Sequence, residues 1–82
     1  MEMQANRQIK TILAENIEAA RKAKGLTRRA LAAQVNDVDP LAIYRWERAE
    51  VMPNAVNMQA LADALGRDVA WFYTDHDTEE AA

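Results

Sequence analysis

Two adjacent arginines offer the clearest chemistry in this sequence of 82 residues. Arg28 and Arg29 follow Thr27, which can cap a helix, so both fall in the first turn of the helix predicted there. A positive charge is unfavourable at that end, because it meets the positive end of the helix dipole. Phosphate groups facing the two arginines would offset this cost. The alternative is that these side chains only solvate the surface.

The arginines must be positioned by a pair of short helices that spans residues 27–47. Leu31 and Val35 lie four apart on one helical face, and Ile43 and Trp46 lie three apart on another, so both faces can pack on one core. Such a pair often holds its second helix in the major groove of DNA. Compact helical proteins in general also contain helix pairs, so the spacing alone leaves both interpretations open.

The junction between the two helices is predicted at residues 36–39. Asp39 can accept a hydrogen bond from a backbone N–H at a helix start. Pro40 suits the first helical turn, where its missing N–H removes no hydrogen bond. The second helix of the pair is therefore expected to begin at Pro40 and to end near Arg48.

Three further helices complete the predicted fold. Apolar spacing predicts one from Ile9 to Lys24, ended by Gly25, and a short last one over residues 69–73, which Asp68 can cap. The other starts after Asn54, which can cap it. In this helix Val56, Ala60, Leu61 and Leu65 are expected to face inward, with Met58 at the edge of that stripe. We expect one domain over residues 1–82, with an ordered core at about 9–73, a frayed start over 1–8 and a flexible acidic tail at 74–82.

The charge is distributed unevenly along the chain. The net charge is −3, which by itself disfavours a nucleic-acid partner. Residues 7–48, however, carry nine Lys or Arg against five Asp or Glu, a net of +4, whereas residues 49–82 carry one against seven, a net of −6, and Glu2 adds −1. Because phosphate contact depends on local charge, the basic part can still bind DNA, with modest non-specific affinity.

Other kinds of chemistry find little support in the composition. The chain has no cysteine, and it has neither an apolar run long enough to span a membrane nor a signal peptide, so we expect a cytoplasmic protein. Asp75, His76 and Asp77 could ligate a metal, but three adjacent residues seldom form a closed site. No Ser–His–Asp set, phosphate-binding glycine loop or pair of buried carboxylates is evident, so we predict no enzyme and no cofactor.

Three segments, in the right order and spacing, resemble the phage-repressor and Cro type of helix-turn-helix protein, also called the XRE family. They are KGLTRRALA at residues 24–32, IYRWERAEVMP at 43–53 and LADALGRDVAWF at 61–72. The resemblance implies an all-α, compact five-helix lambda-repressor-like domain, with the helix-turn-helix at its second and third helices. It also implies a transcriptional regulator, a repressor above all, that binds a palindromic operator in double-stranded DNA as a homodimer.

The resemblance assigns roles to individual residues. Pro40, Leu41, Tyr44 and Arg45 match positions that face base edges, while Thr27, Arg28 and Arg48 match positions at the phosphate backbone, where Arg29 is also expected. Arg45 is the strongest candidate for direct readout, because a guanidinium can bond bidentately to guanine. Leu41 and Pro40 could contact a thymine methyl group, which implies a site specified partly by DNA shape.

Two further roles concern structure and assembly. Glu47 matches an acid that pairs in the family with an arginine late in the first helix, here Arg21; the alternative is two unrelated surface charges. Members of the family commonly dimerise through their last helix. The hypothesis for this chain is therefore an interface that includes Val69 and either Trp71 or Phe72.

The sequence departs from the family pattern at two places. The turn is one residue longer than is usual in the family and has no glycine. Asn36 can take the left-handed conformation in place of glycine, but the additional residue could rotate or shift the following helix. The loop after that helix offers an acid and two apolar residues in place of basic ones.

Two other functions remain open. The acidic residues 49–82 are compatible with an antitoxin or anti-repressor that binds a protein partner. The chain could instead be the DNA-binding part of a longer repressor.

Overall fold

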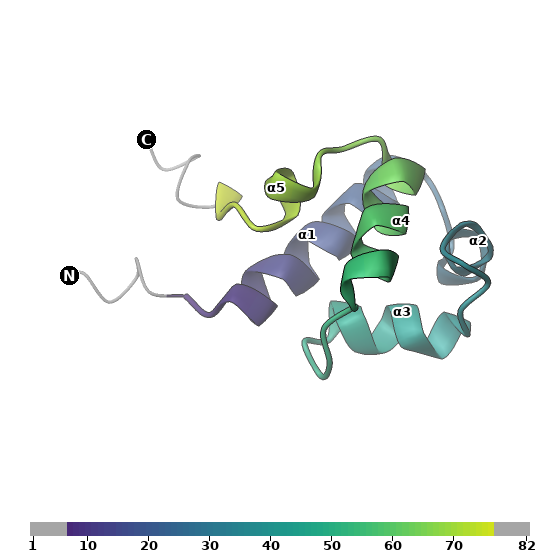
Figure 1. Cartoon of the computed structure of the whole chain (residues 1–82), viewed down its shortest axis with the longest axis horizontal. Coiled ribbons are helices and arrows are strands. Elements are labelled where there is room, and N and C mark those ends of the chain that lie inside the picture. The colour runs from purple at the N-terminus through teal and green to yellow at the C-terminus, as the bar shows by residue number, and fades with distance from the viewer. Residues whose placement is uncertain (1–6, 77–82) are drawn as a thin grey trace.

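A computed structural model describes residues 7–76 of the chain. Within that part the fold is all α-helical (Figure 1), as predicted, with the helices α1 (Ile9–Ala23), α2 (Arg28–Gln34), α3 (Pro40–Glu47), α4 (Ala55–Leu65) and α5 (Val69–Phe72). In Figure 1, α1 runs diagonally behind α4, while α2 and α3 lie at the opposite end from α5. The helix pair α2 and α3 is therefore one edge of the molecule. None of the described helices is long and apolar enough to cross a membrane.

Local capping explains where most of these helices begin. The side chains of Thr27, Asp39 and Asn54 accept hydrogen bonds from the backbone N–H groups of Ala30, Leu41 and Asn57. Each of these bonds satisfies a donor that has no partner inside its helix. The capping predictions for α2, α3 and α4 are thus confirmed, whereas Asp68 makes no side-chain cap at the start of α5.

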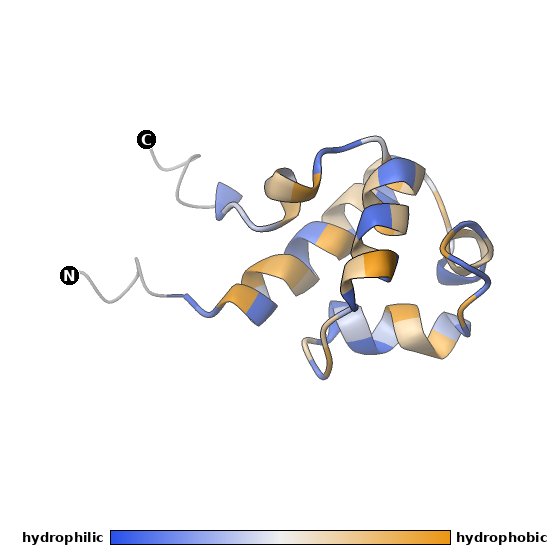
Figure 2. Ribbon diagram, viewed as in Figure 1, coloured by the Kyte–Doolittle hydropathy of each residue, from blue (hydrophilic) through white to orange (hydrophobic). Residues whose placement is uncertain are grey.

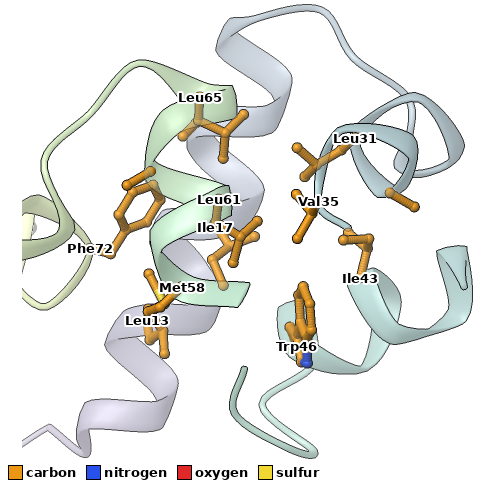
Figure 3. Close-up of a cluster of buried hydrophobic side chains, with 13 residues drawn as sticks. Leu13, Ile17, Leu31, Val35, Ile43, Trp46, Met58, Leu61, Leu65 and Phe72 are labelled. Atoms are coloured by element: carbon orange, nitrogen blue, oxygen red, sulfur yellow. The ribbon is translucent and has the colours of Figure 1, made fainter. Parts of the chain in front are cut away.

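The core lies where α1, α2, α3 and α4 meet, and Phe72 of α5 closes it (Figure 3). Leu31 of α2, Val35 directly after α2 and Ile43 of α3 have no exposed surface, and Trp46 is also buried in this core. Burial of these side chains fixes α3 against the body of the domain from one side. Figure 2 shows the resulting alternation of apolar and polar residues along the helices.

The prediction for the inward face of α4 was right for Leu61 and Leu65 and wrong for Val56 and Met58. Val56, expected in the core, is 69% exposed, while Met58, expected at the edge, is only 3% exposed. The buried stripe is Met58, Leu61, Ala62 and Leu65. Spacings of three, one and three residues describe one helical face as well as the predicted spacing does, so periodicity alone did not decide between them.

The turn between α2 and α3 absorbs its additional residue through two consecutive left-handed residues. Asn36 has φ of 55°, as predicted, and Asp37 has φ of 54°. Asn36 also donates a hydrogen bond of 2.9 Å to Oδ1 of Asn57 in α4. The turn is therefore held against α4 from the side, which helps to fix the start of α3.

The segment after α5 is attached to α1 by a buried asparagine. Nδ2 of Asn16 lies 2.8 Å from the carbonyl oxygen of Phe72, 2.9 Å from that of Thr74 and 3.3 Å from that of Trp71. The ring of His76 lies 4.3 Å, centroid to centroid, from that of Trp71. Residues 74–76, assigned to the flexible tail from the sequence, are thus packed on α1 and α5. Arg7 and Gln8, assigned to the frayed start, are also held in place: Arg7 pairs with Glu15 and Asp75, and the carbonyl oxygen of Gln8 accepts from the backbone of α1. The rest of the predictions for the two ends concern residues 1–6 and 77–82, which lie outside the described residues.

Replacing Asn16 by alanine is expected to lower the free energy of unfolding by roughly 1–2 kcal/mol, because it removes the donor that three partly buried carbonyl groups share. Urea unfolding followed by circular dichroism measures this change. Gln59→Ala, which removes an exposed hydrogen bond to Asp63 within α4, is the control and should alter stability by less than about 0.5 kcal/mol. Equal values for the two variants would show that Asn16 does not anchor the end of the chain.

Candidate nucleic-acid interface

Helix α3 presents two faces of different character. Ile43, Trp46 and Glu47 are buried on the inner face. The outer face carries the side chains predicted to read bases and to meet the backbone: Leu41, Tyr44, Arg45 and Arg48 are all exposed, and Pro40 is half-buried at the start of the helix. The side chain of Arg45 is 54% exposed, and its Nε lies 3.9 Å from Oε1 of Glu50, too far for a hydrogen bond.

The first turn of α2 lies beside this outer face. The guanidinium carbon of Arg28 lies 5.2 Å from the centroid of the Tyr44 ring, and that of Arg48 lies 5.7 Å from the same centroid. Both distances are within the range of a cation–π interaction. Arg29 is exposed, as is Thr27, although the hydroxyl of Thr27 is already engaged in the cap. The structure thus brings two of the predicted phosphate-contact residues, Arg28 and Arg48, together with the predicted base-contact residue Tyr44.

A buried carboxylate lies directly beneath this surface. Nε of Arg21 donates to Oε2 of Glu47 over 2.6 Å and Nη2 donates to Oε1 over 3.2 Å, so the two side chains form a bidentate pair. The side chains of Arg21 and Glu47 are only 9% and 1% exposed. Nη1 of Arg21 also donates to the carbonyl oxygen of Leu26. The pair therefore joins α1, the start of α2 and the end of α3, and the alternative of two unrelated surface charges does not apply.

Glu47 also accepts a hydrogen bond that the sequence did not predict. Nε of Arg28 donates to Oε1 of Glu47 over 2.9 Å. The sequence predicted only a phosphate contact for Arg28. Since 19 residues separate the two partners, neither helical periodicity nor capping pointed to this bond. It gives Arg28 a structural partner at a helix end where its charge is otherwise unfavourable.

The residues predicted for a dimer interface differ in accessibility. Phe72 is completely buried in the core, so its side chain is not available to a second copy, and its place in the predicted interface has to be corrected. Val69 and Trp71 are half-buried and pack on the core from outside. Arg67 covers part of Trp71, with its guanidinium carbon 4.1 Å from the ring centroid.

A second apolar surface follows α3. It consists of Val51 and Met52 in the loop after α3 and Val56 in the first turn of α4, and it is referred to below as the 51–56 surface. These side chains are respectively 50%, 45% and 69% exposed. The sequence indicated the first two as a departure from the family pattern, but it placed Val56 in the core.

Within residues 7–76, no group of three or more His, Asp or Glu side chains is arranged to hold a metal ion. Asp77, the third residue of the acidic trio considered from the sequence, lies outside the described residues. Asp75 instead forms an ion pair of 3.2 Å with Arg7, which also pairs with Glu15.

The two-helix unit, its buried Arg–Glu pair and its exposed α3 face define a helix-turn-helix protein, and a family model described as helix-turn-helix matches residues 17–72. The chain belongs to this family, in its phage-repressor and Cro (XRE) branch. Among solved structures, it is similar to the P22 c2 repressor protein in complex with the synthetic operator 9T, in a crystal containing Tl⁺. The two share 33% sequence identity and superpose with a TM-score of 0.74, over 84% of this chain and 98% of that one. No curated protein matches the chain.

Proposed function

We propose that this protein is a non-enzymatic transcriptional regulator, specifically a repressor, that binds a palindromic operator in double-stranded DNA as a homodimer. The observation that carries the proposal is the outer face of α3, where exposed Leu41, Tyr44 and Arg45 adjoin the arginines of α2. Membership of the helix-turn-helix family and similarity to a repressor crystallised with its operator support it. The proposed geometry places α3 in the major groove.

Each side chain on this surface suits a different contact. Arg45 carries an exposed guanidinium fork that can bond to N7 and O6 of guanine. Leu41 and Pro40 can contact thymine methyl groups, and Tyr44 can reach a base edge through its hydroxyl. Phosphate contacts are proposed for Thr27, Arg28, Arg29 and Arg48, which flank the reading face. We propose that residues 1–82 form the single domain that makes these contacts.

Selection from a random pool of DNA duplexes tests this function. The full chain is expected to enrich one short sequence with inverted-repeat symmetry, and to bind it at least about a thousandfold more tightly than random DNA at the same salt concentration. Equal binding to selected and random duplexes would overturn the proposal. Capture of a stoichiometric basic protein, together with negligible DNA binding, would instead support an antitoxin or anti-repressor built on the same fold.

The homodimer that we propose uses the outer surface of α5, where Val69 and Trp71 lie. The 51–56 surface competes for this role, because it is more exposed and follows directly after α3. Aromatic side chains are frequent in the centre of protein interfaces. We therefore assign the contact to Trp71, and the choice between the two surfaces can be made by substitution.

Trp71→Ala is expected to weaken self-association by about tenfold or more, because a central interface aromatic contributes more than about 1 kcal/mol. Val56→Asp, which places a charge on the 51–56 surface, is the matched variant and should leave self-association unchanged. Sedimentation equilibrium at high micromolar concentration measures both, with circular dichroism to verify folding. A loss confined to Val56→Asp would move the interface to the 51–56 surface, and a monomeric wild type would exclude both assignments.

A further inference from the structure

Arg28 and Arg29 are neighbours in sequence, yet the structure uses them differently. Arg28 donates its Nε hydrogen to Glu47 over 2.9 Å, and its guanidinium lies over the ring of Tyr44 at 5.2 Å. Arg29 is exposed and forms no ion pair within the described residues. The two side chains thus form a natural comparison in the same turn of the same helix.

The charge around Arg28 is largely compensated by the protein itself. Glu47 accepts from both Arg21 and Arg28, and Oε2 of Glu18 lies 3.9 Å from Nη2 of Arg28 and 3.2 Å from Nζ of Lys22. Three cations therefore face two carboxylates. A guanidinium that is already paired gains less from a phosphate than an unpaired one and releases less of the counterion atmosphere of DNA.

Tyr44 is the side chain of α3 that these contacts restrain. Its ring has guanidinium groups from two different elements within 6 Å: Arg28 from α2 and Arg48, which caps the end of α3. Tyr44 is nevertheless 38% exposed. A planar guanidinium that is hydrogen-bonded to a buried carboxylate is a rigid platform for an aromatic ring.

We propose that Arg28 is a positioning residue, which fixes the side chain of Tyr44 and thereby determines the base preference at the position that Tyr44 faces. The chain of contacts runs from the buried carboxylate of Glu47 through Arg28 to the exposed ring. Arg28 acts through Tyr44, and its role as a phosphate contact is secondary to that of Arg29. This inference rests on the proposed DNA-binding function.

The restraint can be measured in the free protein by nuclear magnetic resonance. The Nε–H signal of Arg28 is expected to exchange with water at least about tenfold more slowly than that of Arg29, because it is hydrogen-bonded to a carboxylate with almost no exposed surface. Arg28→Ala should shift the ring resonances of Tyr44, whereas Arg29→Ala should leave them in place. Equal exchange rates and an unmoved Tyr44 would show that the restraint is absent, whether or not the protein binds DNA.

The effect on recognition is measured by repeating the random-pool selection with variants. Arg28→Ala should change the base preference at the same operator position as Tyr44→Ala, by about fivefold or more. The double variant should add nothing further, since both substitutions remove one arrangement. Arg28→Lys should lose the same preference although it keeps the charge, because an ammonium lacks the planar fork.

Arg29→Ala serves as the comparison for a phosphate contact. It should keep the base preferences and lower the slope of log affinity against log salt concentration by about 1.8, because each of the two protomers loses one phosphate contact and each contact contributes about 0.9. Arg28→Ala should change that slope by less than half as much. Unchanged preferences in Arg28→Ala, together with a full loss of slope and rescue by Arg28→Lys, would overturn the inference and make Arg28 a phosphate contact. A wild type that selects no sequence would overturn the proposed function itself.

Discussion

Replacing Glu47 by alanine is expected to lower the free energy of unfolding by roughly 3–5 kcal/mol. The substitution removes the bidentate partner of the Arg21 guanidinium, which is only 9% exposed in the native protein, and leaves it only Glu18, at 4.0 Å; it also releases Arg28. A buried charge that loses its hydrogen-bonded partner is among the most destabilising results of a single substitution. Denaturant unfolding followed by circular dichroism measures the effect.

The size of this loss matters because the domain is small. Stabilities of roughly 0.05–0.15 kcal/mol per residue imply a total of about 4–12 kcal/mol for a chain of this length. Glu47→Ala should therefore be largely unfolded at moderate urea concentrations. Glu50→Ala is the control, since its carboxylate is half-exposed and 3.9 Å from its nearest cation; it should change stability by less than about 0.5 kcal/mol. Comparable values for Glu47 and Glu50 would mean that the buried pair does not hold the helices together.

Arg45→Ala is expected to reduce discrimination at one operator position by about 1–3 kcal/mol, equivalent to roughly 5-fold to 150-fold in relative affinity. The reason is the loss of the only hydrogen-bonding fork among the proposed base-contact residues Pro40, Leu41, Tyr44 and Arg45. Relative affinities for the selected operator and its single-base variants, measured at one salt concentration, give this number directly.

Arg48→Ala is the comparison on the same helix. Its guanidinium is proposed to contact the backbone, so its loss should weaken binding to all sequences, flatten the salt dependence by about 1.8 for the two protomers of the dimer, and leave the base preference at the position of Arg45 unchanged. If Arg45→Ala and Arg48→Ala have the same effects on base discrimination and on salt dependence, the division into base and phosphate contacts is wrong. A loss of discrimination spread over every position would point to a displaced α3.

The elements that sequence could predict were those determined by neighbouring residues. The caps at Thr27, Asp39 and Asn54 and the left-handed Asn36 depend on groups within three residues, so local rules were sufficient. The inward face of α4 was predicted correctly at Leu61 and Leu65 but not at Val56 and Met58, because several apolar stripes fit a helix rich in small residues. Which one turns inward is decided by the neighbouring helices α1, α2 and α5.

In the candidate site, too, features set by neighbouring residues could be predicted, whereas contacts between distant residues could not. The spacing of Ile43 and Trp46 was sufficient to predict the buried face of α3. The base-facing residues on its other side were assigned by the family resemblance. The bond from Arg28 to Glu47 and the contacts of Asn16 join segments 19 and more than 50 residues apart. Such pairs depend on how whole helices pack across one another. The periodicity of a single sequence does not predict that packing.

The hydrogen bonds from Asn16 to the carbonyl groups of residues 71, 72 and 74 have a mechanical consequence. If a polypeptide attached beyond residue 76 pulls on the chain, the force reaches Thr74 before it reaches α5. From there the hydrogen bond of 2.9 Å to Asn16 transfers it into the middle of α1, and the ion pair between Asp75 and Arg7 transfers it to the start of the same helix. The longest helix of the domain would therefore bear the load, and α3 would keep its orientation while the end of the chain is under tension.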